Sequence, residues 1–586
     1  MLTQTEKEIL AHVASDAGWA LVETFARTRR ELPEEFENGA AILAERLCAL
    51  GLEPQQQTPL LYLGIPRSAS VSCEGRRFHS KATALSPARA PITASLVHVP
   101  ARDGSARTHS GDPEVIFGEG VTRETLKARV QGRIVLTEGL SNPGRSELME
   151  KLGALAVITI NPGKSVHWGA SSAIWGNPLL EDMNRLPQMV SMAVSREDGN
   201  YLVDAAARGA EVTIEADVLH GWFPQTVTTV EIRAEGRHAD EFVLLHGHLD
   251  SWDLGVGDNA TGDATLLEVA RALQAGRSAL RRSVRIAWWP GHSAGRYAGS
   301  TWYADSHAFD MVANCVAHLN CDSPGCKDAT DYSHIRGMAE AQPLVASVVA
   351  DLFGQECTLE RPSRGGDYSF NNLGVTGALL TSSMVPAEER KRRGWYTVGG
   401  NGGSPTWHTE NDVFEVADRA VLENDVRLYT LAALRLAAAE VPHLDYRIPL
   451  RDLVGRVAEV DEKAKGLVDL APHRRLLAQL SACLGEAYEA GTTSASGAAW
   501  PAVKRAGRAI VRAGYVERGV FEQDSAFAKP FLPLLAAVGN IQRQPAAFTS
   551  LQRGANLLRA EIAEAVGAFL PMHDSGRIGL LQGTPQ

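Results

Sequence analysis

The stretch FVLLHGHLDSWDLGVGDNATG, residues 242–262, decides the fold of this chain. Its apolar run at 242–245 predicts a buried strand that leads to His248, and a helix is expected over 264–273. Asp258 lies between them in the Gly-rich loop GVGDNATG, which lets its carboxylate face inward. The stretch therefore predicts a strand, a polar loop and a helix in succession, the unit from which parallel sheets are built.

The same alternation continues on both sides of this stretch. Apolar or β-branched runs predict further strands, and the segment 413–441 is largely helical in period. The expected strands are 227–232, 284–289, 312–319 and 377–380. The sequence thus predicts an α/β class fold, with a mostly parallel mixed sheet covered by helices.

The length of 586 residues exceeds one ordinary core, and the pattern divides the chain into three parts. Residues 1–90 and 219–445 are expected to form a split α/β domain that begins with two amphipathic helices. Residues 91–218 read as a β-rich insertion, in which a helix separates two short buried strands. Residues 446–586 are helical in period almost throughout.

Composition narrows the class of protein. The formal net charge is -11 and the pI about 5.9, which argues against nucleic acid as the main partner. No stretch is long and apolar enough to span a bilayer, and the N-terminus lacks a signal-type apolar segment. The seven cysteines contain no Cys-x-x-Cys pair. We expect a reduced, cytoplasmic protein without a membrane partner.

Metal-ligating side chains follow the predicted strands. In an open α/β sheet ligands gather beyond the carboxyl ends of the strands, so several strands can deliver residues to one crevice. Singly, each residue is more often a surface group or a helix cap; their joint spacing favours a metal site. Imidazole and carboxylate suit zinc, with manganese or iron as alternatives. The candidates are His248, Asp258, His292, Asp322 and His408.

At these residues the chain resembles the co-catalytic zinc peptidase family that contains glutamate carboxypeptidase, carboxypeptidase Q and the transferrin receptor. The likeness covers most of 220–440. Its motifs are HGHLDSWDLGVGDNATG, AWWPGHSAGRYAGSTWYAD, HLNCDSPG, RGGDYSF and SPTWHTEND. The segment VQGRIVLTEGL…KLGALAVITINPG is similar to that family's inserted protease-associated domain, and the C-terminal helices to its dimerisation domain. The resemblance implies a zinc aminopeptidase-like fold and a homodimer.

The resemblance also assigns roles to individual residues. His248 and Asp322 would bind one metal ion, Asp258 would bridge, and His408 would bind a second ion. Asp250 would orient a ligand from outside the coordination sphere. The family pattern further implies that two neighbouring residues line the substrate site. These are Asp367 and Tyr368.

One departure from the family pattern decides the chemistry. The family has two adjacent glutamates where this chain has His292-Ser293, and no carboxylate lies from Pro290 to Ser300. Three hypotheses follow. His292 replaces the missing metal ligand, or it is the general base beside a weak or absent second metal, or the site is inactive and the fold serves binding.

Several other residues are candidates with weaker support. Glu410 is the nearest motif carboxylate that could replace the missing base. Arg364 and Arg296 could bind a substrate carboxylate, and the loop pair Trp395 and Tyr396 could contact substrate.

The sequence hypothesis is therefore a metal-dependent hydrolase of a peptide-like or other small amide, with one or two divalent ions. It would use metal-activated water without the usual glutamate base, at catalytic residues His292, Asp250 and Glu410. The alternatives are a metal-dependent lyase on the same fold and a catalytically inactive binding or scaffold protein.

Overall fold

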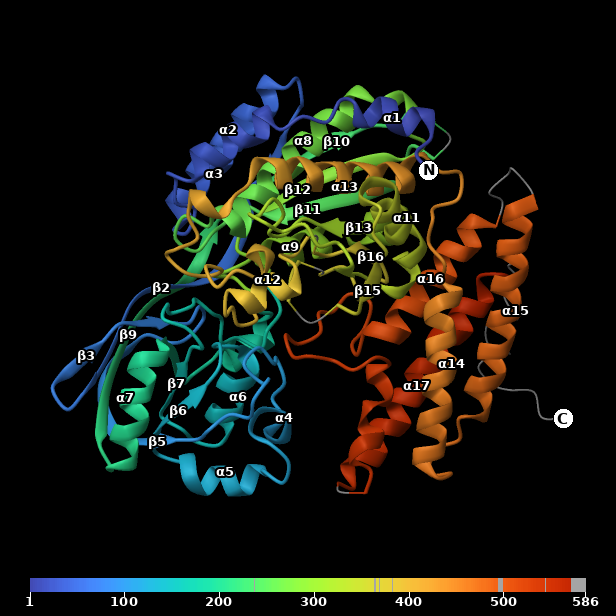
Figure 1. Ribbon diagram of the computed structural model, residues 1–586. Coiled ribbons are helices and arrows are strands. Elements are labelled where there is room, and N and C mark those ends of the chain that lie inside the picture. The colour runs from blue at the N-terminus through green and yellow to red at the C-terminus, as the bar shows by residue number, and fades with distance from the viewer. Residues whose placement is uncertain are drawn as a thin grey trace.

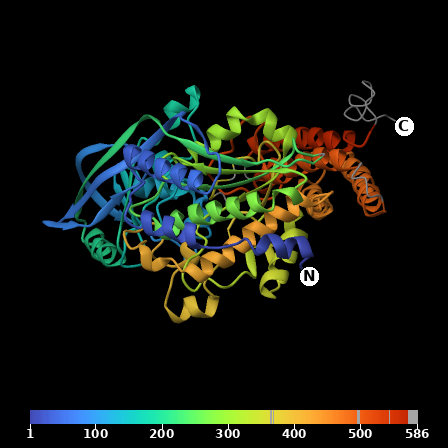
Figure 2. The same ribbon diagram turned by 90° about the horizontal axis from the view of Figure 1, so that it is seen from above.

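The computed structural model describes residues 1–236, 238–362, 365–367, 369–381, 383–493, 499–542 and 544–570. The chain forms an α/β part, a second strand-rich part and a set of C-terminal helices (Figure 1). Seen from above, the strand-rich part and the C-terminal helices lie at opposite ends of the α/β part (Figure 2).

The α/β part is built on a six-stranded sheet in the order β1-β10-β12-β11-β13-β16. Its four strands β12, β11, β13 and β16 run parallel, and β10 and β1 add antiparallel at one edge. The expected mostly parallel mixed sheet is thus present. The strands are β1 Gln55–Gln57, β10 Val227–Ile232, β11 Phe242–His248, β12 Ser283–Trp289, β13 Cys315–Asn320 and β16 Thr376–Leu379.

Helices cover both faces of this sheet because successive strand side chains point to opposite sides. Val243 and Leu245 of β11 belong to the core that contains α8 and α13, whereas Phe242 and Leu244 pack with α9 and α10. The helices of this part are α1 Gln4–Leu10, α2 Asp16–Phe25, α3 Pro33–Ala49, α8 Thr261–Ala275, α9 Ala298–Ser306, α10 Ala308–Asn314, α11 Gln342–Phe353, α12 Ala387–Arg392 and α13 Arg419–Ala438.

Short elements complete the α/β part. β14 His334–Arg336 and β15 Thr358–Glu360 form a two-stranded parallel sheet. The single-turn helices here are η2 Val256–Ala260, η3 Arg277–Ala279, η4 Ala339–Ala341, η5 Asn401–Gly403 and η6 Phe414–Val416.

The second part is an eight-stranded sheet in the order β3-β2-β9-β5-β6-β7-β8-β4. Its long antiparallel pair β2–β9 is registered from Leu60↔Pro224 to Cys73↔Val212 and leads out of the α/β part. Its strands are β2 Leu60–Cys73, β3 Arg76–Phe78, β4 Ser80–Ala82, β5 Arg89–His98, β6 Ile134–Glu138, β7 Ala156–Ile160, β8 Val190–Val194 and β9 Glu211–Pro224. Its helices are α4 Pro113–Phe117, α5 Arg123–Val130, α6 Pro143–Lys151, η1 Leu180–Arg185 and α7 Arg196–Ala207.

This sheet corrects the expected boundary at residue 91. Strands β2, β3 and β4 precede that boundary, yet they hydrogen-bond into the second sheet because β2 pairs with β9 along most of its length. The second sheet therefore begins at residue 60. Its kinship with protease-associated domains stays a prediction.

The C-terminal part is helical, as its period predicts, and its helices join the same hydrophobic core as α8 and α13. They are α14 Arg447–Ala464, α15 Ala471–Thr493, α16 Trp500–Tyr515, η7 Pro533–Asn540 and α17 Ala546–Gly567. In the described ranges, none of the helices combines the length and apolar character needed to cross a bilayer.

Two expected elements differ from the structure. The N-terminal segment contains three helices rather than two, because Pro33 starts α3 separately from α2. The strand expected over 312–319 is shorter, because Met311 and Val312 still belong to α10 and pack on the core before β13 begins at Cys315.

A buried carboxyl lies where the C-terminal helices join the sheet. Glu340 is fully buried and accepts a hydrogen bond from the Thr376 hydroxyl at 2.7 Å, and Thr376 Oγ1 also lies 3.0 Å from the Tyr446 hydroxyl. Burial raises the pKa of Glu340 to about 7, against 4.5 in its unperturbed state. The folded protein therefore holds this group neutral where the unfolded chain would ionise it.

Because the folded-state pKa is raised, Glu340 weakens folding progressively as pH rises from about 4.5 through about 7. Glu340→Gln removes this effect. We expect the urea midpoint of the variant to rise relative to that of the wild type as the pH increases from 5 to 8. A constant difference between the two proteins across that range would contradict this assignment.

Candidate metal centre

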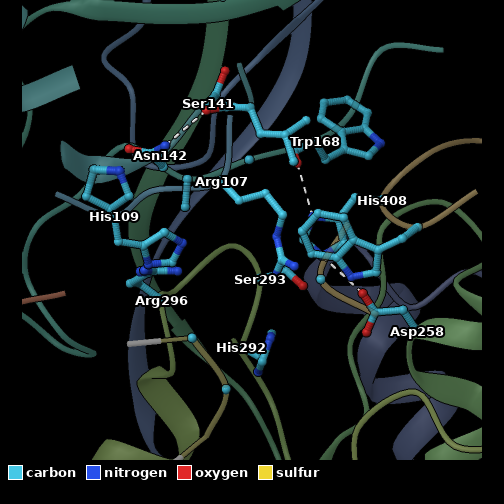
Figure 3. Close-up of a pocket in the computed structure, with 18 of the residues that line it drawn as sticks. Arg107, His109, Ser141, Asn142, Trp168, Asp258, His292, Ser293, Arg296 and His408 are labelled. Carbon is cyan, nitrogen blue, oxygen red and sulfur yellow. Dashed lines mark hydrogen bonds and ion pairs between the residues drawn. The ribbon is translucent and has the colours of Figure 1, made fainter. Parts of the chain in front are cut away.

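The carboxyl ends of the parallel strands bring the five proposed metal ligands into one region. His248 ends β11, the loops after β12 and β13 carry His292 and Asp322, and η2 carries Asp258. Four of the five line one pocket together with Trp168, and Figure 3 labels Asp258, His292, His408 and Trp168 there. His408 comes from the loop between η5 and η6 rather than from the end of a strand.

Asp258 is the centre of this group. Its Oδ1 lies 2.9 Å from His248 Nε2 and its Oδ2 lies 3.0 Å from His408 Nε2. The carboxylate is buried, with 6% of the residue exposed. Each of its two oxygens therefore faces one imidazole, the arrangement expected of a carboxylate that bridges two positions.

Both imidazoles are oriented by a backbone carbonyl. His248 Nδ1 donates to the carbonyl of Asp250 at 2.8 Å, and His408 Nδ1 donates to the carbonyl of Trp168 at 3.1 Å. A carbonyl only accepts, so each Nδ1 carries the proton and each Nε2 points to Asp258. Metal-binding histidines in proteins are commonly fixed in this way.

His292 has an equivalent support, although its partner is a carboxylate. Its Nδ1 contacts Asp367 Oδ2, and Ser300 Oγ donates to the other oxygen of Asp367 at 2.6 Å. The imidazole stacks on His248 with ring centroids 3.8 Å apart. Ligand atoms of His248, His292 and Asp322 all lie within 4.8 Å of one another. His292 therefore lies with the other proposed ligands. These five residues, His248, Asp258, His292, Asp322 and His408, are called the metal-type cluster below.

The charges of the site follow from burial and pairing. Burial opposes ionisation of Asp258, but His248 and His408 hold its pKa well below the usual range. Burial would likewise lower the pKa of His248, yet the hydrogen bond and charge of Asp258 raise it well above the usual value. Burial and the charge of Asp258 raise the pKa of Asp322. Both neighbours thus respond to the negative charge of Asp258, which favours the charged form of His248 and disfavours ionisation of Asp322.

The pKa of Asp367 moves the other way from that of Asp322. Burial opposes its ionisation, but the charge and hydrogen bond of His292 lower the pKa below the usual value. Asp367 is therefore an ionised acceptor for Nδ1 of His292, which leaves Nε2 as the ring nitrogen available to the site.

Two polar side chains hold the loops that carry the ligands. Asn259 Nδ2 donates to the carbonyls of His248 at 3.1 Å and Cys321 at 2.9 Å, and its Oδ1 accepts from the Ser323 amide at 2.9 Å. This amide group therefore ties together the ends of β11 and β13. The peptide bond before Asn259 is cis.

Asp412 fixes the loop from the other side. Its carboxylate accepts from the backbone amides of Gly257 at 2.7 Å and Asp258 at 3.0 Å. A Cβ at Gly257 would lie 2.7 Å from the Asn401 side chain, so a larger residue would push this loop away. Burial and the charge of Asp258 raise the pKa of Asp412 to about 7.

The donor set fits a divalent metal ion. Three imidazoles with Nδ1 already engaged and two aspartates, of which Asp258 is buried, are the ligand types that zinc takes in hydrolytic sites. The partner of Nε2 is the Asp258 carboxylate for both His248 and His408, and a bound cation would share this carboxylate.

Comparison with known proteins agrees with this geometry. Residues 229–430 match the model of peptidase family M28, and this range contains all five proposed ligands. This segment belongs to peptidase family M28.

The relatives cover only part of the molecule. A probable leucine aminopeptidase 2 from Arthroderma benhamiae is 27% identical over 283 residues, 47% of this chain and 50% of the relative. A probable glutamate carboxypeptidase VP8 from Zea mays is 37% identical over 87 residues, 14% of this chain and 12% of the relative. The chain thus spans about half the length of the leucine aminopeptidase it matches.

Similarity to solved structures covers a larger share of this chain. An aminopeptidase from Aneurinibacillus sp. strain AM-1 has a TM-score of 0.53 at 19% identity, covering 74% of this chain and 96% of the other. A zinc aminopeptidase from Bacillus subtilis has a TM-score of 0.53 at 18% identity, covering 73% and 97%. The expected zinc aminopeptidase-like fold is therefore confirmed.

Two residues with expected catalytic roles have defined contacts in this M28 segment. The backbone carbonyl of Asp250 accepts from His248 Nδ1 at 2.8 Å, and its carboxylate lies 3.9 Å from the same nitrogen. That carboxylate also accepts from the amides of His292 at 3.0 Å and Ser293 at 2.9 Å. Glu410 is half exposed and paired with Lys81 at 2.7 Å, outside the pocket, so it does not replace the missing base.

Only some of the proposed substrate residues lie at or beside the pocket. Arg296 lines the pocket, and Asp367 lies behind His292 as its support. Trp395 packs near Arg393, and the Tyr396 hydroxyl lies 2.7 Å from a ring nitrogen of His167, so neither reaches the pocket. Arg364 and Tyr368 lie outside the described residues.

Several pocket residues were not found from the sequence because they come from the second sheet or from short strands. Trp168 stacks on Trp252 with centroids 5.2 Å apart and forms one wall, and Arg107 and Arg336 also line the pocket. No local motif marks these positions. Trp168 and Arg107 lie in the part of the chain between β2 and β9, the paired strands that lead from the α/β part into the second sheet.

Asp412→Ala removes the acceptor of two buried backbone amides. Each unpaired buried donor costs about 1–3 kcal/mol, so we expect a lower melting temperature and weaker zinc binding. Asp204→Ala, at an exposed position of α7, is the matched control. Equal melting temperatures and zinc affinities for the two variants would contradict the role of Asp412.

Proposed function

We propose that this protein is a metal-dependent hydrolase of a peptide-like or other small amide substrate. The observation that carries the proposal is the shared orientation of three histidines. His248, His292 and His408 each engage Nδ1 with an oxygen and leave Nε2 for the region of Asp258 and Asp322. Membership of residues 229–430 in family M28 supports the same reaction class.

In this proposal the five side chains hold one or two ions, zinc in the first instance. Such an ion supplies Lewis-acid activation of the amide carbonyl and of water when bound. Replacing a carboxylate ligand by the imidazole of His292 leaves the donor set with one negative charge fewer, which favours that activation.

His292 acts as the ligand that fills the position of the missing acid. Asp367 holds the proton on Nδ1, so that the lone pair of Nε2 is directed to the site. Asp250 fixes the backbone of His292 and Ser293 and thereby sets where the imidazole stands. His292 could instead act as a general base. The two roles differ in metal content, because removal of a base would not release a metal ion whereas removal of a ligand would.

The walls of the pocket orient the substrate and exclude water. The Trp168–Trp252 stack lies beside His408, and Trp168 also donates its backbone amide to the carbonyl of His408 at 2.8 Å. A ligand that rests on this stack would lie against the metal-type cluster. The homodimer and the cytoplasmic location remain predictions.

The first test is the metal content of His292→Ala. If His292 is a ligand, the variant purified with zinc loses one equivalent, or binds zinc much more weakly, and loses amide hydrolysis. His79→Ala, at an exposed position, is the control. Elemental analysis and hydrolysis of aminoacyl amides supply the measurements. Full metal content with lost activity would instead assign His292 as the base.

The same analysis separates the remaining alternatives. A wild-type protein without tightly bound transition metal would overturn the hydrolase proposal in favour of a binding protein. Metal-loaded protein that eliminates rather than hydrolyses would identify a lyase.

Asp367→Asn tests the support of His292 without removing the imidazole. The neutral amide still reaches Nδ1 but no longer stabilises its proton by charge, so we expect zinc affinity to fall about 10- to 100-fold. Asp204→Asn is the exposed control. Unchanged zinc affinity measured by competition with a chelator would show that the His292–Asp367 pair does not serve the metal.

A further inference from the structure

The pocket beside the metal-type cluster carries an unbalanced positive charge. It has a volume of about 310 Å³, within the range of small-ligand sites, and its lining comes from the α/β part, the second sheet and the C-terminal part. Three guanidinium groups line it, those of Arg107, Arg296 and Arg336. Figure 3 shows Arg107 and Arg296 in the pocket with Asp258 and His408.

Among the described residues, no acidic side chain forms an ion pair with these arginines. The acidic residues that line the pocket are Asp258 and Asp322, which belong to the metal-type cluster. In the described part of the chain, the ion pairs include none from Arg107, Arg296 or Arg336. The positive charge is therefore available to a ligand.

Arg296 is the most constrained of the three. It is 8% exposed, and its Nη1 donates to the Tyr297 hydroxyl at 3.1 Å. Its Nε and Nη2 are buried and have no hydrogen-bond partner among the described residues. A buried donor without an acceptor is costly, and for a charged group the cost is higher. A ligand oxygen that reaches the Arg296 fork would remove that cost.

Arg107 and Arg336 reinforce the field. Burial and the like charge of Arg336 lower the pKa of Arg107 to about 10, so the two side chains repel each other. The whole chain carries a net charge of -11, so a general excess of basic residues does not explain three arginines at one place without an ion pair to any described residue. An anion is the ligand that this local arrangement would stabilise.

Resting on the proposed function, we propose that this pocket binds a carboxylate of the substrate. The substrate class is then an amide that carries a carboxylate close to the bond that is cleaved. Arg296 binds that carboxylate through its free Nε and Nη2, and Arg107 and Arg336 stabilise the charge. Packing of Arg296 over Tyr297, at 4.8 Å from the ring centroid, fixes the guanidinium plane.

Binding without turnover tests the carboxylate site independently of hydrolysis. Glutarate and its uncharged diamide, glutaramide, are titrated into the zinc-loaded protein at constant ionic strength. We expect glutarate to bind measurably tighter. Arg107→Gln, Arg296→Gln and Arg336→Gln should each weaken glutarate about 10- to 100-fold. Arg77→Gln, an exposed arginine of β3, should leave it unchanged.

Two results would overturn this site. Equal binding of glutarate and glutaramide shows that charge is not recognised. A preference for glutarate that survives all three substitutions places the carboxylate on the metal ion rather than on the arginines. Because Arg107 and Arg336 are less buried than Arg296, their variants keep the test decisive if Arg296→Gln does not fold.

Hydrolysis then distinguishes the two sources of the carboxylate. Ala-Asp and Ala-Asn are compared, each with a free and an amidated C-terminus. A side-chain carboxylate makes Asp preferred over Asn in both forms, whereas a terminal carboxylate makes amidation harmful for both. Arginine-dependent glutarate binding without hydrolysis of any amide would refute the proposed function alone. Hydrolysis indifferent to every carboxylate would refute the carboxylate site alone.

Discussion

The site depends on the pairing of one buried carboxylate with two imidazoles. Asp258 lies between His248 and His408, and its burial would be unfavourable without them. A metal ion would replace the protons between Asp258 and the two imidazoles, so the same three side chains could bind a cation without rearrangement. Asp412 holds the loop of Asp258, and the carbonyls of Asp250 and Trp168 orient the two imidazoles.

The supports come from different parts of the chain. Asn259 joins the ends of two strands, Asp412 holds the loop of Asp258, and the backbone of Trp168 orients His408 from the second sheet. This distribution explains why the second sheet is part of the functional unit. Its long β2–β9 pair carries Trp168 to the site, whereas the α/β part alone would leave Nδ1 of His408 without that carbonyl.

The sequence was informative where chemistry and periodicity coincide. The apolar run before His248, the Gly-rich loop of Asp258 and the position of His292 predict the α/β fold and the cluster, because strand ends in such sheets converge. It was uninformative where a role depends on backbone groups. The residue types do not reveal that the backbone carbonyl of Asp250 orients His248, nor that its carboxylate accepts hydrogen bonds from backbone amides.

Distant pairing explains the other differences. Glu410 lies two residues from His408, yet its side chain turns to Lys81 of the second sheet, which no local pattern indicates. Arg107 and Arg336 also line the pocket, from segments in which the sequence shows no motif. Their convergence with the proposed metal ligands depends on how the sheets are joined.

Anomalous diffraction at the zinc edge, from crystals of the zinc-loaded protein, tests the central claim most directly. The account predicts a peak bounded by His248, Asp258 and Asp322 with Nε2 of His292 at coordination distance. A map in which His292 points away from every zinc peak, or in which the cluster contains no peak, would contradict it.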